Sequence, residues 1–254
     1  MSAAADHVRP PSSDQLTASM SRSDDGGLTW SAAADIGARP AVGVFPAIRP
    51  TGELVVAYLW EFGRFAIAAS TSADGGASWG APVRIADVSG SCGISGFRAF
   101  PLPSADADAN GRVWVTWHDC AAAGATQSAV FVANSADGTT WSSPSPVTQG
   151  RNTVLPAIGV DPGSGRIAIA YMRDAADGIQ TELVEATAAG AFGAPRRLSA
   201  EGSAFTSIAR TTSGRMLGDY ISVHYARGRP LAVWVLALTP VDGTFRQAVY
   251  ATRG

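Results

Sequence analysis

The sequence of 254 residues contains no lysine, so its 19 basic residues are all arginines. We attribute this bias to a GC-rich genome, since it points to no particular function. Guanidinium groups suit carboxylate and phosphate ligands. The formal net charge of -2, however, leaves no basic surface of the kind that binds nucleic acid. We therefore expect no nucleic-acid partner.

Long apolar runs are also missing. No run approaches the roughly 18 residues that a membrane span needs, so we expect no span. The first residues, MSAAADHVRPPSSDQ, lack the apolar segment of a secretory signal, and we expect residues 1–16 to form a flexible leader. Glycine (28) and proline (15) are frequent, and β-branched and aromatic residues cluster in short runs. This composition favours an all-β protein.

Cysteine is scarce, with Cys92 and Cys120 alone in the chain. Two interpretations stay open: two buried thiols, or one disulfide that closes a loop of about 28 residues and contributes about 3–4 kcal/mol. Both cysteines lie near the edges of predicted strands in the same repeat, which favours the disulfide. A disulfide implies an oxidising compartment, so we expect an extracellular or secreted protein although no signal peptide is visible.

The chain repeats itself. Four tight turns each lead into an apolar run that reaches an aromatic residue six positions after the turn glycine. The turn glycines are Gly52, Gly111, Gly165 and Gly228. Before each turn lies a further predicted strand, in the segments VFPAI, AFPLP, VLPAI and MLGDY, which contain Phe45, Phe100, Leu155 and Leu217.

Each repeat predicts four short antiparallel strands over about 50–60 residues, the signature of a β-propeller blade. We therefore predict an all-β propeller over residues 17–254. The chain would begin in mid-blade, contain three full blades and end in mid-blade, about four and a half in all. Five or six blades would make the complete form, so we expect that N-terminal blade segments are missing.

The hairpin between the third and fourth strands carries the pattern Ser-x-Asp-x-Gly-x-x-Trp. Serine and aspartate can bind nearby backbone groups, glycine permits positive φ, and tryptophan packs the turn. We interpret the pattern as structural rather than as a ligand or Ca²⁺ site, because it recurs and because a fourth copy keeps only its aromatic residue. The residues are Ser23, Asp25, Gly27 and Trp30; Ser72, Asp74, Gly76 and Trp79; and Ser135, Asp137 and Trp141.

This pattern is the Asp-box, and residues 17–254 resemble the sialidase (neuraminidase) superfamily of Asp-box, or BNR-repeat, β-propellers. The likeness is closest to bacterial secreted sialidase-like proteins. It implies a glycoside hydrolase with a tyrosine nucleophile activated by a glutamate, an aspartate as acid and base, and three arginines on the sialic acid carboxylate. Neither a cofactor nor a metal is expected.

The family's catalytic pattern is matched only in part. Tyr220 is expected on the first strand of the last blade, one residue away from the position of the family's tyrosine. Val44 stands where the first arginine should be, and Arg98 comes one residue early in a similar motif. Only Glu182 and Glu185 are plausible partners for the tyrosine.

The propeller mouth, where first strands begin and second strands turn into third strands, is the expected place of the site. Each charged candidate there could instead be a solvated loop residue or an inter-blade ion pair. Asp119 and Asp174 occupy similar repeat positions, which favours that structural interpretation. The catalytic candidates are Tyr220, Asp219, Arg98, Arg173 and Asp174, and the ligand-binding candidates are Glu61, Arg64, His118 and Asp119.

Two functions therefore stay open. One is an exo-α-sialidase-type hydrolase acting on a glycan or sialoside. The other is a non-catalytic propeller, or a truncated paralogue, that binds glycan or protein. The first predicts that Arg98, Arg173 or Arg64 converge near Tyr220. The sequence leaves the oligomeric state open.

Overall fold

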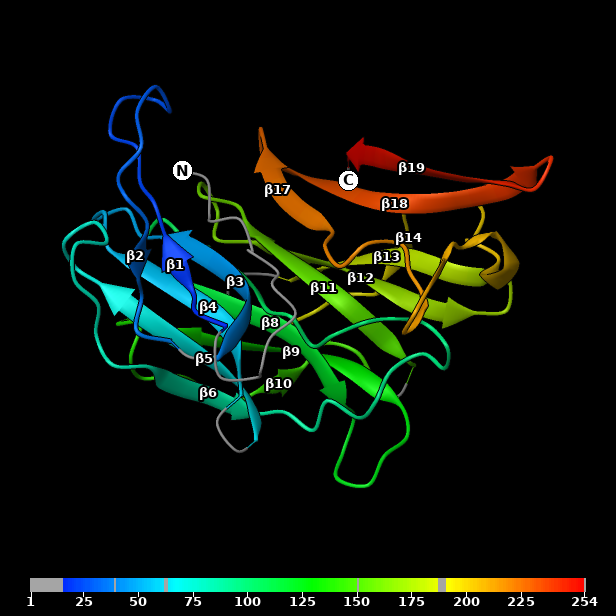
Figure 1. The fold of residues 1–254 in the computed structure, drawn as a ribbon, viewed down its shortest axis with the longest axis horizontal. Coiled ribbons are helices and arrows are strands. Elements are labelled where there is room, and N and C mark those ends of the chain that lie inside the picture. The colour runs from blue at the N-terminus through cyan, green and yellow to red at the C-terminus, as the bar shows by residue number, and fades with distance from the viewer. Residues whose placement is uncertain (1–15, 39, 62–63, 150, 187–190, 254) are drawn as a thin grey trace.

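The computed structural model describes residues 16–38, 40–61, 64–149, 151–186 and 191–253 (Figure 1). Apart from Leu16, the expected leader lies outside these ranges. Strands dominate them, and the single helical element there is a 3₁₀ turn at Phe205–Ser207. No helix in the described ranges is long and apolar enough to span a membrane. The predicted all-β class is confirmed.

Three four-stranded antiparallel sheets follow one another along the chain. In each, the strands pair in sequence order, as tight turns between short β-rich segments require. The first sheet contains β3 (Ala41–Ile48), β4 (Leu54–Glu61), β5 (Phe65–Ser72) and β6 (Val83–Asp87). The second contains β7 (Ser104–Ala107), β8 (Val113–Cys120), β9 (Ser128–Ser135) and β10 (Ser145–Pro146). The third contains β11 (Thr153–Val160), β12 (Ile167–Ala175), β13 (Gly178–Ala186) and β14 (Arg196–Arg197).

Smaller sheets flank these three. Before them lies the pair β1 (Ser19–Met20) and β2 (Ala34–Asp35), and after them the three-stranded sheet of β17 (Ser222–Ala226), β18 (Arg229–Val241) and β19 (Thr244–Arg253). A short ribbon of β15 (Arg210–Thr211) and β16 (Gly214–Arg215) precedes β17. Within the described ranges, β19 pairs with β18 alone and β1 with β2 alone.

The hydrophobic core consists of layers between consecutive sheets. Alternate residues of β4 point to opposite faces, so that Val55 and Leu59 pack toward the second sheet while Val56 and Tyr58 pack toward β1 and β2. Two further clusters join the second sheet to the third and the third to the β17–β19 sheet. Sheets with both faces buried in this way stack like propeller blades.

Two expected strand starts are wrong. Phe100 lies before β7, which begins at Ser104, and the prolines at 101 and 103 cannot donate to a strand ladder. Tyr220 likewise lies before β17, which begins at Ser222. Met216 and Asp219, just before Tyr220, contact Arg98.

The two ends of the four-stranded sheets are named as follows. We call the end with the first-strand starts and the turns from second to third strands the mouth. We call the opposite end, with the Ser-x-Asp-x-Gly hairpins, the Asp-box end.

Candidate functional site

The Asp-box hairpins are closed by hydrogen bonds of short range. In the second copy, Ser72 Oγ accepts from the Gly76 amide at 2.7 Å, and Asp74 accepts from the amide and the hydroxyl of Ser78 at 2.8 and 2.5 Å. These donors, the Ser78 hydroxyl first, hold the pKa of Asp74 well below its usual value. The carboxylate of Asp74 is thus hydrogen-bonded within its own turn.

The first and third copies follow the same plan. Asp25 accepts from Thr29 through amide and hydroxyl, which lowers the pKa of Asp25 to about 2. Asp137 accepts from the amides of Thr139 and Thr140 at 2.7 and 2.6 Å, and these bonds lower its pKa well below the usual value. Ser23 and Ser135 bind the turn amides of Gly27 and Gly138.

The tryptophans of the three hairpins differ. Trp30 is 44% exposed and donates from Nε1 to Gly27 O at 3.1 Å. Trp79 and Trp141 pack against hydrophobic clusters, and their Nε1 atoms are buried without a partner among the described residues. The two partly buried rings therefore act as packing groups, and only the exposed Trp30 closes its own turn.

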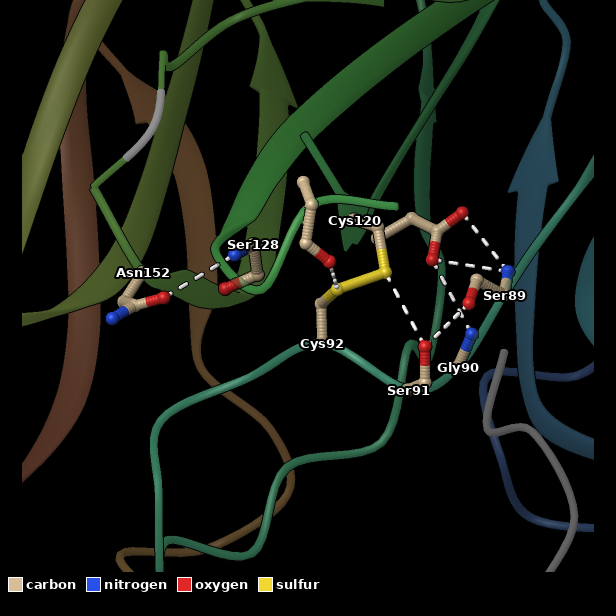
Figure 2. Close-up of a disulfide and its surroundings, with 9 residues drawn as sticks. Ser89, Gly90, Ser91, Cys92, Cys120, Ser128 and Asn152 are labelled. Carbon is tan, nitrogen blue, oxygen red and sulfur yellow. Dashed lines mark hydrogen bonds between the residues drawn. A yellow bond between two sulfur atoms is a disulfide. The ribbon is translucent and has the colours of Figure 1, made fainter. Parts of the chain in front are cut away.

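At the mouth, residues 88–103 form a long connection between β6 and β7, which we call the strap. A disulfide between Cys92 and Cys120 ties the strap to the end of β8, beside Ser89, Gly90 and Ser91 (Figure 2). The carboxylate of Asp119 accepts from the Ser89 amide at 3.0 Å and from the Gly90 amide at 3.3 Å. Asp119 is thus an anchor of the strap.

The far end of the strap reaches the segment before β17. Phe97 forms a parallel bridge with Arg215, and the Arg98 amide donates to Arg215 O at 2.8 Å. Phe97 is buried in the cluster between the third sheet and the β17–β19 sheet. The strap thereby joins residues of the second repeat to residues of the last one.

This crossing brings two of the five catalytic candidates, Arg98 and Asp219, into contact, and a third, Tyr220, follows Asp219 in the chain. Arg98 Nη1 donates to both carboxylate oxygens of Asp219, at 2.7 and 2.8 Å, and lies 2.9 Å from the sulfur of Met216. The Arg98 guanidinium also stands 5.1 Å from the ring centre of Phe100. Tyr220 follows Asp219 directly and is 53% exposed. We call Arg98, Phe100, Asp219 and Tyr220 the mouth cluster.

The other two catalytic candidates have different surroundings. Arg173 donates from Nε to Glu182 at 2.8 Å, and Tyr171 donates to the same carboxylate at 3.1 Å. Burial, followed by the Glu182 charge, raises the pKa of Tyr171 well above its usual value. The side chain of Asp174 is exposed, and its amide donates to Asn152 O at 3.2 Å. Arg173 is thus half of an ion pair with the buried Glu182.

His118 is not a mouth ligand but a core residue. Its side chain is 1% exposed, and its Nδ1 accepts from the amide of Leu155 at 3.3 Å. Burial lowers the pKa of His118 to about 3, so the ring is neutral at physiological pH. Leu155 has a positive φ of 50°, which is uncommon for a branched side chain, at a bulge in β11. His118 thus links the second sheet to this strained point of the third.

The last two candidates lie at the β4–β5 turn. Arg64 is exposed and lines a cleft of about 390 Å³ together with Phe65, Asp87, Val88 and Ser89. The side chain of Glu61 lies outside the described part. Among the described residues, no group of three or more His, Cys, Asp or Glu side chains could hold a metal ion.

Several contact residues were missed in the sequence. Phe97 and Arg215 bridge the strap to the last repeat, yet they are 118 residues apart and follow no local pattern. Phe65 and Ser89, which line the cleft, were missed for a similar reason. The pairing of β5 with β6 brings them together although they are far apart in the sequence. Only the unusual length of the strap could have drawn attention to it.

Sequence comparisons give no family, since neither a family model nor a curated protein matches the chain. Solved structures do match. A protein of unknown function from Dyadobacter fermentans aligns with a TM-score of 0.62 and 15% identity, over 98% of this chain and 70% of its own. The Hadza microbial sialidase Hz136 aligns with a TM-score of 0.57 and 13% identity, over 94% of this chain and 50% of the sialidase.

An α-L-arabinanase from Penicillium chrysogenum, complexed with arabinobiose, aligns with a TM-score of 0.55 and 16% identity, over 86% of this chain and 66% of its own. These alignments, together with the stacked four-stranded sheets, decide the architecture. The chain has the sialidase-like β-propeller fold. The propeller spans about half the length of the sialidase that it matches. At such identities the likeness concerns the fold alone.

Proposed function

We propose that this sialidase-like propeller is a glycan-binding protein whose ligand site is the mouth cluster. The observation that carries the proposal is the contact of Arg98 with Asp219, beside the ring of Phe100 and next in the chain to the exposed Tyr220. Phe100 is 48% exposed and Tyr220 is 53% exposed. Sugar rings present C–H faces that stack on aromatic rings and hydroxyl groups that bind charged side chains.

The polarity of the cluster supports this ligand class. Asp219 accepts hydrogen bonds from Nη1 of Arg98. No described residue accepts a hydrogen bond from Nε or Nη2 of Arg98. The guanidinium is therefore oriented by its partner and keeps donors for a ligand oxygen. The strap adds rigidity, because its disulfide at Cys92 and its bridge at Phe97 both fix the chain just before Arg98.

The solved structures with the same fold support the proposal indirectly. They include a sialidase, an arabinanase with bound arabinobiose and an arabinofuranosidase with an iminosugar inhibitor. A disulfide is typical of proteins outside the reducing cytosol. We accordingly place the proposed glycan ligand, and the protein, outside the cell.

An exo-α-sialidase-type hydrolase is the second candidate. The contact of Arg98 with Asp219, followed in the chain by the exposed Tyr220, favours it, because these are side chains of the types that this chemistry uses. A three-arginine clamp is not supported by the contacts described. Arg98 pairs with Asp219, Arg173 pairs with Glu182, and Arg64 lines a separate cleft.

The test compares wild type with Tyr220→Ala, Tyr220→Phe and Arg98→Ala in binding to 3′-sialyllactose and arabinobiose. We expect Tyr220→Ala and Arg98→Ala to weaken binding by about tenfold or more, and Tyr220→Phe to retain it through stacking. Phe245→Ala is the matched control, because Phe245 is also exposed, at 45%, but lies on β19. Unchanged affinity in both Tyr220→Ala and Arg98→Ala would reject the proposal.

Turnover separates the two candidates. A glycan-binding protein leaves a fluorogenic sialoside intact. Hydrolysis by wild type that disappears in Tyr220→Phe would instead establish the hydrolase, because that change removes only the phenolic oxygen.

A further inference from the structure

The cleft at the β4–β5 turn, which we call the rim cleft, is separate from the residues of the mouth cluster. It is lined by Arg64, Phe65, Asp87, Val88 and Ser89 and has a volume of about 390 Å³. That volume lies in the range of small-molecule sites. Its lining comes from the end of β6, the start of β5 and the first residues of the strap.

The wall formed by the strap is held in place from several sides. The Val88 amide donates to Phe65 O at 2.9 Å, and the Ser89 amide donates to Asp119 at 3.0 Å. The hydroxyls of Ser89 and Ser91 lie 2.6 Å apart, and the disulfide at Cys92 follows directly (Figure 2). A wall fixed in this way presents the Ser89 side chain to the cleft at little entropic cost to a ligand.

The aromatic surface of the cleft is the Phe65 ring, which lies next to Gly90. Phe65 is 39% exposed, and a Cβ atom at Gly90 would stand 3.4 Å from its Cδ2 atom. Gly90 also has a positive φ of 65°, which strains any other residue. The Phe65 ring therefore offers a face on which the C–H groups of a sugar can stack.

The lining of the cleft contains one charged residue of each sign, Arg64 and Asp87. Asp87 forms an ion pair with Arg84, so its carboxylate is already compensated. Arg64 is exposed and has no ion-pair partner among the described residues. An aromatic face, a serine hydroxyl and one uncompensated guanidinium together fit a sugar ring that carries a carboxylate.

We propose that the rim cleft binds a uronic acid residue of an acidic polysaccharide. In this site Phe65 stacks on the ring, Arg64 binds the carboxylate and Ser89 binds a ring hydroxyl. Asp119 is a positioning residue, since it holds the strap wall and stands behind the Ser89 amide. The site is independent of the mouth cluster and of the function proposed for it.

The test uses the full chain and two probes of the same ring size, methyl β-D-glucuronide and methyl β-D-glucoside, in ligand-observed NMR titrations. We expect the glucuronide to bind wild type about tenfold or more tightly than the glucoside. Arg64→Gln should remove this preference, and Phe65→Ala should weaken both ligands. Equal binding of the two probes to wild type, or unchanged binding in both variants, would overturn the proposal.

Two control variants locate the ligand. Phe245→Ala removes a similarly exposed ring on β19 and should leave the glucuronide affinity unchanged. Tyr220→Ala should also leave it unchanged, whereas loss of glucuronide binding in that variant would place the ligand at the mouth cluster instead. A failure of the mouth-cluster proposal, seen with 3′-sialyllactose and arabinobiose, has no effect on this result.

Asp119→Asn tests the positioning role. The variant should weaken both glycosides by a similar factor of a few-fold and leave their affinity ratio near the wild-type value. A changed ratio would show that Asp119 meets the carboxylate directly, and unchanged affinities would show that the wall does not depend on it.

Discussion

The Asp-box end and the mouth of this propeller are held by contacts of different range. At the Asp-box end, Asp74 binds Ser78 and Ser72 binds Gly76, each only four residues away along the chain. At the mouth, Arg98 binds Asp219 across 121 residues, and the disulfide spans 28. Motifs of the first kind can recur in every repeat, while contacts of the second kind occur where particular loops meet.

The largest effect should come from opening the disulfide at the mouth. Reduction should lower the free energy of unfolding by about 3–4 kcal/mol, because it frees a loop of 28 residues. Urea unfolding with and without dithiothreitol measures the difference. The double variant Cys92→Ala/Cys120→Ala should be insensitive to dithiothreitol, and equal stability of oxidised and reduced wild type would show that the strap is held without the bond.

The second effect concerns acid stability through His118. Its folded pKa is about 3 and its unfolded pKa about 6.5, so the neutral ring stabilises the protein fully above pH 6.5. As the pH falls from about 6.5 to about 3, the ring binds a proton in unfolded chains and not in folded ones, so the free energy of unfolding decreases.

Urea midpoints between pH 7 and pH 4 measure this loss. His118→Gln should be less stable at pH 7 but should show a shallower decline, whereas His224→Gln, at an exposed position of β17, should follow the wild-type slope. An identical slope in wild type and His118→Gln would contradict the assignment.

The third effect is the coupling of Arg98 with Asp219. Both side chains are partly buried, with exposed fractions of 24% and 21%. A double-mutant cycle with Arg98→Ala and Asp219→Ala should give a coupling of about 1 kcal/mol in the free energy of unfolding. A coupling near zero would mean that the Phe97 bridge, and not this ion pair, holds the far end of the strap.

The smallest effect should appear at the Asp-box end. Asp74→Ala should lower the melting temperature by about 2–4 °C, because the Ser78 amide loses its acceptor, and should leave glycan affinity unchanged. Asp74→Asn keeps one acceptor oxygen and should cost less. Loss of glycan affinity in Asp74→Ala, with the melting temperature unaltered, would reverse the comparison between the two ends.

Much of the architecture could be read from the sequence. The spacing of Gly52, Gly111 and Gly165 predicted three complete four-stranded units, and the structure contains three such sheets in sequence order. Errors arose at Phe100 and Tyr220, where apolar segments resembled first strands. Both segments serve tertiary contacts of the strap, which a local pattern does not encode.

The candidate site was predictable only in its residue types. Arg98, Asp219 and Tyr220 were each marked as candidates, but nothing in the sequence indicated that Arg98 pairs with Asp219. His118 appeared to be a loop ligand and is a buried core residue, because the strand continues through it to Cys120. Whether a polar residue of a strand end faces solvent or the next sheet depends on packing that lies outside the repeat.

The sequence by itself determined the repeating sheets and their Asp-box hairpins, since turn residues and strand alternation act over a few neighbouring positions. The tertiary structure alone decided which charges are paired, that the His118 ring is buried and where the rim cleft opens. Those outcomes depend on the strap, whose contacts join repeats that are far apart in the chain and gain their energy only when the sheets have stacked.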